Sequence, residues 1–344
     1  MASYLLDTVL TEWRSDYQDT KLDVHEHRLS NYGALEAFAL DTPNLVNADQ
    51  IASERTAASR TEKISVIARK TYSLTTTRAC TAIDNSNDSN LVTVTWATLR
   101  TGFHMVPSQY RNNHVGFMED LNRKMIDVQR TFLTQLDTLA AANLNTNKSA
   151  VNNADGNPYT VASDTMEVPD ADKDNYFNEL DAIMMTNDLQ GPLNVVASTR
   201  TSALVKELFN QGGGNDSNTQ YQFNNQNFHF SNRVSVATGD AYTVFAMPFG
   251  SLAYLSWVDI DAQDNNTAIS GKEWRKVNMP LLGHDVGLLF QDSCADNSTE
   301  AGSGTEASLK QSYTFSFDYA FINAYNSNTV ALPGTIFKAG ISKT

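Results

Sequence analysis

The longest helical pattern in the chain runs from His114 to Leu144. Its apolar residues stand four, three, four, four and three positions apart: Leu121, Met125, Val128, Phe132, Leu136 and Leu139. This spacing places them in one stripe along one side of a helix, so a sheet or another element must cover that side. At about 1.5 Å per residue the segment forms a rod of about 45 Å. The stripe is too brief and irregular for a sustained coiled coil.

The composition favours β structure and loops around a few strong helices. Only 19% of the 344 residues are charged, while 41% are hydrophobic. An average soluble domain has about 25% charged residues. Asn and Thr are plentiful, and such uncharged polar residues suit turns and the outer faces of strands. The predicted fold class is therefore α+β.

A long β-hairpin is predicted directly before the helix. Alternating β-branched residues occupy Lys63–Ile83 and Leu91–Leu99, and the polar turn "DNSNDSN" separates them. Arms of this length reach on the order of 45 Å at ~3.3 Å per residue. Such a hairpin cannot bury both of its faces within its own domain, so it either folds onto a sheet or projects to another molecule.

The N-terminal forty residues are predicted to form an arm that docks its apolar side on another element. Apolar residues recur there at helical spacing: Leu5, Leu6, Val9, Trp13, Leu35, Phe38 and Leu40. Pro43 is expected to end this helical pattern, because proline biases its predecessor away from the helix.

The second half of the chain is predicted to begin with helix, strand and helix and to continue as strands. A helix is expected at 174–191, a buried strand at 192–198 and a helix at 199–214. The later strand patterns cover 228–237, 241–258, 284–292 and 309–325.

The charge balance argues against a protein that grips nucleic acid directly. The formal net charge is −14, and the longest basic stretch, Arg60–Lys70, is a strand pattern with scattered charges. Binding to phosphates requires clustered cations. A protein that only surrounds nucleic acid remains compatible with this composition.

The chain is expected to be made and kept in a cytoplasm. Cys80 and Cys294 are the only cysteines, so no disulfide framework or zinc ribbon is available, and both thiols are expected to be buried or inert. The N-terminus lacks a basic region before its apolar residues, which is unlike a signal peptide. No run of eighteen apolar residues is present, so no membrane span is expected.

Acidic residues at Asp170, Asp172 and Asp174 match the first three positions of a calcium loop. The sixth position lacks glycine, and Asp181 stands where a bidentate glutamate belongs. We interpret this run as the acidic N-terminus of a helix.

Three other short patterns contain residue types that occur in functional sites. His25 and His27 resemble half a metal site without a second half. His284 and Asp285 form an adjacent acid–base pair without a recognisable nucleophile. The glycines at 212–214 lack the Lys-Ser/Thr that follows in a phosphate-binding loop. The sequence therefore predicts no catalytic residue, no metal site and no cofactor, and the protein is expected not to be an enzyme.

The order of arm, long hairpin, long helix, helix-strand-helix, β-rich insertion and returning strand resembles the major capsid proteins of tailed bacteriophages, which have the Hong Kong 97-like fold. The resemblance rests on topology and pattern over most of the chain, because the family has no diagnostic short motif. The closing "YTFSFDYAFINAYNSNTVALPGTIFKAG" is also similar in style to the last strand and tail of such proteins.

The resemblance implies an N-terminal arm at 1–52, an E-loop hairpin at 53–104, a peripheral domain with the spine helix at 105–192 and 310–344, and an axial domain at 193–309. It also implies self-assembly into hexamers and pentamers of an icosahedral shell that encloses double-stranded DNA without sequence-specific binding. Scaffolding, portal and decoration proteins are implied as partners. The location would be the virion capsid, assembled in the host bacterial cytoplasm.

The chain departs from some members of that family. The N-terminal segment is too short for a large cleavable scaffolding domain. Lys63 and Lys70 lie in the hairpin where some members crosslink to asparagine, but no motif identifies an Asn partner, so that chemistry is not carried over.

Three alternatives remain open at this stage. A tail-tube or decoration protein is a different virion part, although a tube subunit has little place for a thirty-residue helix. A bacterial nanocompartment shell shares the capsid fold and differs in its cargo. A hydrolase that uses His284 and Asp285 requires a pocket that unites them with a third polar group.

Overall fold

The structure of the 344-residue chain is a computed structural model. It describes residues 10, 11, 13, 32–46, 53, 57, 59, 60, 63–65, 74–78, 80, 91–110, 114–149, 157–187, 189, 191–211, 222, 223, 225–259, 262, 267–269, 272–295, 308–324 and 334–343. The N-terminal pattern before residue 10, the hairpin turn at 84–90, His25, His27 and the glycines at 212–214 lie outside these residues.

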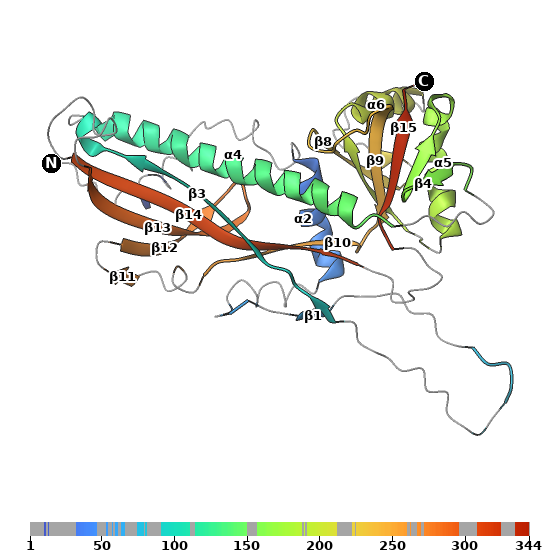
Figure 1. Cartoon of the computed structure of the whole chain (residues 1–344), viewed down its shortest axis with the longest axis horizontal. Helices are drawn as coiled ribbons and strands as arrows, with labels where there is room; N and C mark the ends of the chain where they lie inside the picture. Colours follow the sequence, from blue (N-terminus) through green and yellow to red (C-terminus); the bar gives the residue numbers. More distant parts are fainter. Residues whose placement is uncertain are drawn as a thin grey trace.

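The molecule is elongated and contains two large β-sheets joined by helices, besides a small two-stranded sheet (Figure 1). One sheet has the strand order β10-β14-β13-β12-β11, with β3 paired to β14 in addition. The other has the order β4-β5-β15-β9-β6-β8-β7. The long helix α4, His114–Thr146, lies along the six-stranded sheet and ends beside the seven-stranded sheet.

The six-stranded sheet is built around β14, Ser308–Asn323, a strand of 16 residues. β13 (His284–Ala295) and β10 (Leu252–Trp257) pair along one side of it, and β3 (Ala97–Met105) pairs along the other. β12 (Lys272–Met279) and β11 (Thr267–Ile269) continue the sheet beyond β13.

The apolar stripe of α4 covers one face of this sheet, as the sequence predicts. Leu121, Met125, Leu136 and Phe132 are buried, and Phe132 meets Phe317 of β14 edge to face with ring centroids 5.0 Å apart. These contacts belong to the larger hydrophobic core of the molecule. The predicted helix is confirmed and extends two residues beyond Leu144.

The seven-stranded sheet is mixed and is covered on both faces. Its interior strands are β15 (Phe337–Ser342), β9 (Asp240–Pro248), β6 (Leu193–Ser198) and β8 (Gln226–Ser231), and its outer strands are β4 (Thr160–Ala162), β5 (Thr165–Val168) and β7 (Gln222–Phe223). All six residues of β6 are buried, as a strand covered on both faces requires.

Helices α5 (Lys173–Thr186) and α6 (Thr201–Gln211) cover one face of the seven-stranded sheet. Val195 and Val244 point toward these helices, whereas Val196 and Phe245 point to the core shared with α2 and α4. The alternation follows from the two-residue period of a strand. The expected helix-strand-helix order of this region is confirmed.

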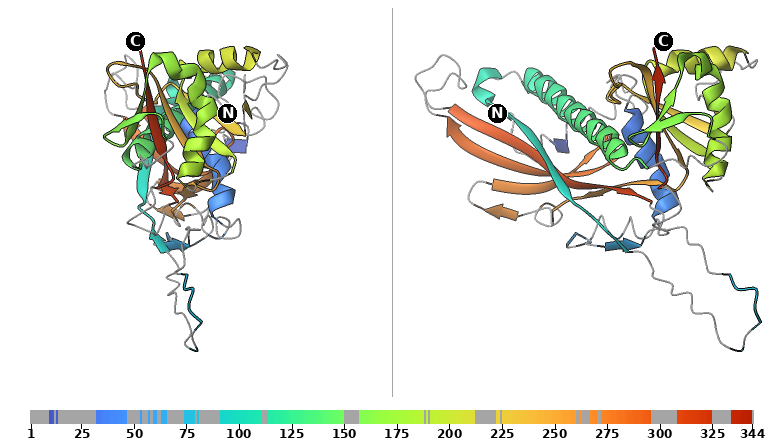
Figure 2. Two further views of the ribbon diagram at one scale, coloured as in Figure 1. Left: turned by 90° about the vertical axis from the view of Figure 1, so that its right-hand side faces the viewer. Right: turned by 45° about the vertical axis from the view of Figure 1, so that its right-hand side comes forward.

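Helix α2, Gly33–Leu45, lies between the two sheets and contacts β10, α4, β8 and β6 (Figure 2). Leu35 and Phe38 are buried there, so this part of the expected arm docks within its own chain, whereas Leu40 is exposed. The predicted break at Pro43 is wrong, because the helix continues to Leu45. Proline removes one helical hydrogen bond, and the tertiary contacts of the last turn outweigh that loss.

The sheets divide the chain differently from the expected domain ranges. β10 to β13, inside 193–309, pair with β14 and β3 beside α4. β4, β5 and β15, inside 105–192 and 310–344, pair with β9 and β6 instead. Gly250, with φ of +79°, turns the chain from β9 into β10 and so from one sheet to the other. Because these paired strands are far apart in the chain, no local sequence pattern indicates which strands pair.

Candidate assembly surfaces

The base of the predicted hairpin is present. β1 (Lys63–Ser65) and β2 (Leu91–Thr93) pair antiparallel, with Lys63 opposite Thr93 and Ser65 opposite Leu91. This short ladder lies beside the six-stranded sheet, and β3 follows it directly. Within the described residues, 63–65 and 91–93 therefore form a two-stranded sheet of their own.

Side chains of the six-stranded sheet fix the chain where it enters and leaves the hairpin. Asp318 of β14 accepts hydrogen bonds from the Arg60 guanidinium at 3.1 Å and the Thr98 hydroxyl at 2.5 Å. The indole Nε1 of Trp257 donates to the carbonyl oxygen of Ala57 at 2.9 Å, and the Arg60 guanidinium lies over the Trp257 ring at 5.9 Å. The base of the hairpin is therefore anchored on both β14 and β10.

Residues 74–78, in the first arm of the hairpin, stand away from both sheets at the lower right of Figure 1. The side chain of Leu74 is 92% exposed, and its neighbours in this segment are exposed as well. Of the two predicted outcomes for the hairpin, projection applies to residues 74–78, whereas residues 97–99 at the end of the second arm pair with β14 in the six-stranded sheet. An exposed segment that contains an apolar side chain is available to another molecule.

Large apolar side chains are also exposed on the body of the molecule. Val115, at the start of α4, is 68% exposed, and Leu309, at the start of β14, is 49% exposed. Met185, at the end of α5, is exposed at the opposite end. Single exposed apolar residues are common on soluble proteins, so these three positions alone do not indicate an interaction surface.

A buried carboxylate locks α2 to the junction of the two sheets. Asp41 is 1% exposed and accepts hydrogen bonds from the backbone amides of Gly250, Ser251 and Leu252 at 2.7, 2.8 and 2.8 Å. These amides belong to the turn that leads from β9 into β10. A carboxylate satisfied by several amide donors is a strong, directional anchor.

A second buried carboxylate joins α4, α2 and β8. Asp137 of α4 accepts the backbone amide of Leu35 at 3.0 Å and the hydroxyl of Ser231 at 2.6 Å, and Arg233 lies 3.6 Å from it. Leu35 is in the first turn of α2, so Asp137 caps that helix from another element. The two sheets are therefore held in a fixed relation through α2.

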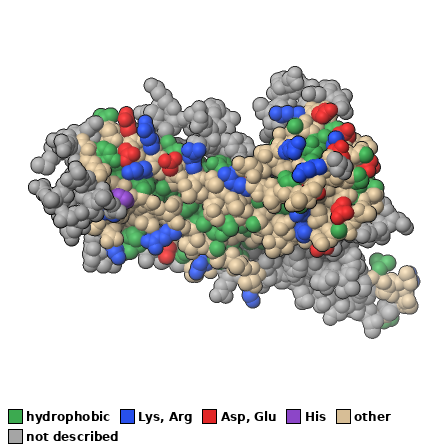
Figure 3. All heavy atoms as spheres, turned by 45° about the horizontal axis from the view of Figure 1, so that its top comes forward, with side chains coloured by type: hydrophobic (Ala, Val, Ile, Leu, Met, Phe, Trp, Pro, Cys, Tyr) green, Lys and Arg blue, Asp and Glu red, His purple; other side chains and the backbone are tan. Residues whose placement is uncertain are grey.

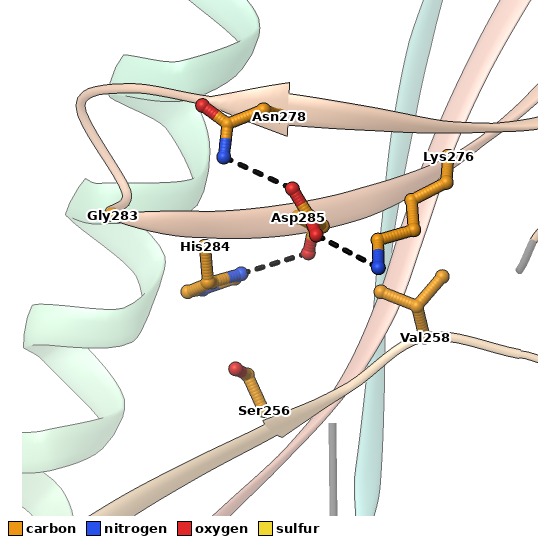
Figure 4. Close-up of a pocket in the computed structure, with 7 residues that line it drawn as sticks. All are labelled: Ser256, Val258, Lys276, Asn278, Gly283, His284 and Asp285. Carbon is orange, nitrogen blue, oxygen red and sulfur yellow. Dashed lines mark hydrogen bonds and ion pairs between the residues drawn. The ribbon is translucent and has the colours of Figure 1, made fainter. Parts of the chain in front are cut away.

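The candidate acid–base pair lines a small polar pocket of about 120 Å³ with Ser256, Lys276 and Asn278 (Figure 4). The pocket unites His284 and Asp285, but their side chains are engaged separately. His284 Nε2 lies 2.9 Å from the Tyr254 hydroxyl, and His284 Nδ1 lies 2.9 Å from the backbone carbonyl oxygen of Asp285.

The carboxylate of Asp285 is bound to other partners. Asn278 donates to it at 3.0 Å, and the Lys276 ammonium lies 2.9 Å from it. Burial alone would raise the pKa of Asp285, but the hydrogen bonds from Asn278 and Lys276 outweigh burial and hold that pKa below its usual range. The carboxylate therefore does not orient His284, and no general base is assembled for Ser256.

The calcium-loop candidate forms the start of a helix. A 3-10 turn, Asp170–Asp172, leads directly into α5, and the Lys173 ammonium pairs with Asp170 at 3.0 Å. The described residues contain no group of three His, Cys, Asp or Glu side chains arranged for a metal ion. The interpretation as an acidic helix N-terminus is confirmed.

Cys80 is exposed, so of the expected states, buried or inert, burial does not apply to this thiol. Within the described part of the chain, no helix combines the length and the apolar character needed to cross a membrane.

Sequence reasoning missed the two buried carboxylates. Asp137 follows Leu136 on the buried side of α4, so an acidic residue on an apolar helical stripe was the available signal. Asp41 lies next to the exposed Leu40 and two residues before Pro43, and no pattern distinguishes it from a surface residue.

In sequence, the chain matches no protein-family model and no curated protein. In structure, it is similar to a chain from Mycobacterium phage Bobi, with 11% identity, 91% of each chain covered and a TM-score of 0.45. It is similar to the capsid structure of the cyanophage P-SCSP1u, with 9% identity, 84% of this chain and 91% of that chain covered and a TM-score of 0.41.

A third similar structure is the holo-SrpI encapsulin complex from Synechococcus elongatus PCC 7942, with 10% identity, 75% of this chain and 77% of that chain covered and a TM-score of 0.35. At these identities and TM-scores, the likeness carries no argument about function. The chain's own geometry must carry that argument.

Proposed function

We propose that the chain is a major capsid protein of a tailed bacteriophage. Copies of it assemble as hexamers and pentamers into an icosahedral shell around double-stranded DNA. The observation that carries the proposal is the projecting segment at 74–78, whose Leu74 is 92% exposed while the hairpin base is anchored to β14 and β10. A segment that is anchored at its base and exposed at 74–78 suits a contact between subunits.

The rest of the molecule supports a building block. The two sheets, α4 and α2 form one elongated body, and Asp41 and Asp137 tie its halves together. A shell subunit needs extended surfaces that neighbouring copies complete. A tail-tube subunit dominated by a β-sandwich offers no comparable role for the 33-residue helix α4.

In this proposal the sheets replace the sequence-based domain boundaries. The peripheral domain comprises α4 and the six-stranded sheet, at 97–146 and 252–323. The axial domain comprises the seven-stranded sheet with α5 and α6, at 160–248 and 337–342. The hairpin that begins near Lys63 is the E-loop, α4 is the spine helix, and residues 1–52 form the N-terminal arm with α2 as its docked part.

The same proposal assigns no catalytic role to the chain. The separate engagement of His284 and Asp285 supports a structural role for both residues. Scaffolding, portal and decoration proteins are the partners that such a shell protein requires, and the virion capsid is its location after assembly in the host cytoplasm.

The test changes the projecting segment. Leu74→Asp places a charge where a neighbouring copy would cover an apolar side chain, so we expect sedimentation of the purified protein to shift from large particles to free subunits or capsomers. Val236→Asp, at a body position that is 39% exposed, serves as the matched control and should assemble normally. Normal particles from the Leu74 variant would contradict the role of the hairpin.

The contents of the particles separate a virion from a nanocompartment. A phage shell filled in infected cells contains double-stranded DNA, whereas a nanocompartment contains protein cargo. Nuclease-protected DNA in particles from infected cells is the expected result.

A further inference from the structure

The face of the six-stranded sheet that points away from α4 has an unusual composition. Val277, Leu288 and Phe315 point into the core, so the residues that alternate with them point outward. Directly paired residues on antiparallel strands share a face. Three outward rows cross β12, β13, β14 and β3: Lys276, Gly287, Ser316 and Arg100; Trp274, Leu289, Thr314 and Gly102; Lys272, Gln291, Ser312 and His104. We name these twelve residues the basic face.

The basic face contains no carboxylate, although the chain as a whole carries a formal charge of −14. Arg100 and Lys272 are exposed, and neither forms an ion pair with any residue that the structure describes. Three carboxylates adjoin these twelve residues: Asp285 and Asp318 continue the same outward face, and Asp259 lines the first depression together with Arg100. Asp285 is bound to Lys276, and Asp318 is bound to Arg60. The sequence hides this patch because its cations come from two strands, β12 and β3, that are far apart in the sequence.

The basic face is hollowed as well as charged. Two adjoining depressions, of about 290 and 380 Å³, share Arg100 and Thr314 in their linings. Gly287 lies beneath Val258 and Ala262 of the segment after β10, Gly102 lines the second depression, and Trp274 lies half-buried in the lining of the first. Asp259, from the segment after β10, also lines the first depression. Aromatic and arginine side chains of this kind are enriched in the centres of protein interfaces.

We propose that the basic face binds the acidic end of a second copy of this chain. This inference rests on the proposed self-assembly. The acidic end is the segment 164–181, which holds seven Asp and Glu residues and one Lys and includes the turn before α5. Glu167 and Asp174 are exposed within it.

The two surfaces lie at opposite ends of the molecule, with β12 at one end and β4, β5 and α5 at the other (Figures 1 and 3). Figure 3 shows acidic side chains at the end that holds the seven-stranded sheet, where they stand among Lys and Arg side chains. They therefore cannot meet within one chain. A contact between unlike surfaces of identical subunits generates a ring when the rotation closes.

Charge and shape favour a protein partner over nucleic acid. A protein that holds nucleic acid neutralises many phosphates in a row. The basic face offers three Lys and Arg side chains in all, and one of them, Lys276, is already paired with Asp285. Arg100 and Lys272 form no ion pair with a described residue. Trp274 and Leu289 between these cations suit the side chains of a folded surface.

The test is a charge swap in the full chain. Arg100→Glu with Lys272→Glu should raise the concentration needed for assembly by about tenfold, because opposed charges become repulsive. Arg123→Glu with Arg130→Glu, on the solvent side of α4, changes the net charge equally and should leave that concentration within about twofold of wild type. Circular dichroism of the unassembled variants verifies that both pairs fold.

The second arm of the test restores the contact. Glu167→Lys with Asp174→Lys should weaken assembly alone and should recover it when combined with the Arg100 and Lys272 changes. Unaltered assembly of the first pair, or a combined variant no better than either pair, would overturn the proposal. Normal assembly with reduced DNA retention would overturn it in favour of a nucleic-acid surface. A wild-type chain that never assembles contradicts the proposed function itself.

Discussion

At the scale of single residues, two buried carboxylates do more than any exposed charge to define the subunit. Asp41 binds the turn between the sheets, and Asp137 binds the first turn of α2. Burying a carboxylate is costly unless its oxygens are fully hydrogen-bonded, so both sites are intolerant of change. By contrast, the exposed ion pair of Arg130 and Asp127, 3.7 Å apart, contributes little.

The Asp41→Asn substitution tests this anchor. An amide keeps one acceptor oxygen and turns its NH₂ group toward backbone amides that also donate, so we expect a loss of about 3 kcal/mol in the free energy of unfolding. Urea denaturation of the unassembled subunit measures it. Asp127→Asn is the matched control, with a change below about 0.5 kcal/mol. If the two variants were equally stable, Asp41 would not be an anchor between α2 and the turn that leads from β9 into β10.

The carboxylate of Asp285 predicts a pH dependence. Its pKa is lowered in the folded chain, so the folded state binds fewer protons than the unfolded state near the ordinary pKa of 3.8. The stability it contributes is present above that pH and is lost as the pH falls through the folded pKa. At pH 7 the free energy of unfolding of the wild type should exceed that of Asp285→Asn by about 0.5 kcal/mol. This value is small because the ion pair is partly exposed to solvent.

That difference should vanish below the lowered pKa of Asp285. Paired urea titrations at pH 7 and in strong acid measure it. A difference that stays constant with pH would show that the carboxylate charge contributes nothing.

At the scale of elements, α2 depends on a close approach to β8. A Cβ atom at Gly33 would lie 2.4 Å from the carbonyl oxygen of Phe230, which is backbone and cannot move aside. The first turn of the helix therefore rests directly on the strand. This contact, the bond to Asp137 and the bonds from Asp41 together set the angle between the two sheets.

Gly33→Ala should therefore displace α2 and lower the free energy of unfolding by about 2 kcal/mol, as overpacking does in a filled core. Thermal unfolding followed by circular dichroism measures the loss. Ala142→Ser, at an exposed position of α4, is the control and should shift the midpoint very little. A stable Gly33→Ala variant would show that the approach is less tight than described.

The elements with strong local patterns could be predicted from the sequence, and their pairing could not. The stripe from Leu121 to Leu139 predicted α4, and the apolar run at 193–198 predicted β6. The division into two large sheets depends on β14, which pairs with the preceding strand β13 and also with β10 and β3, which are distant in sequence. The continuation of α2 past Pro43 likewise depends on tertiary contacts that no local propensity encodes.

The candidate site was predictable in part. The base of the hairpin at Lys63 and Thr93 follows from the alternating pattern. The separation of His284 from the Asp285 carboxylate follows from strand geometry, because consecutive residues point to opposite faces. The basic face was hidden, since Arg100, Trp274 and Lys272 meet only through strand register.

At the scale of the whole molecule, the shape carries the functional argument. An elongated body with two sheets, a rod-like helix and an anchored projecting segment leaves surfaces that one chain does not complete (Figures 1 and 2). The formal charge of −14 adds repulsion between copies. In the proposed shell, specific contacts at the hairpin and at the basic face would have to overcome this repulsion.

Cryo-electron microscopy of the expressed full-length protein, with its scaffold where one is needed, tests this account most directly. We expect closed shells in which residues 74–78 of each copy lie against a neighbouring copy and the subunits form hexamers and pentamers. A monomer under every condition of salt and concentration, or a hairpin folded back onto its own chain, would contradict it.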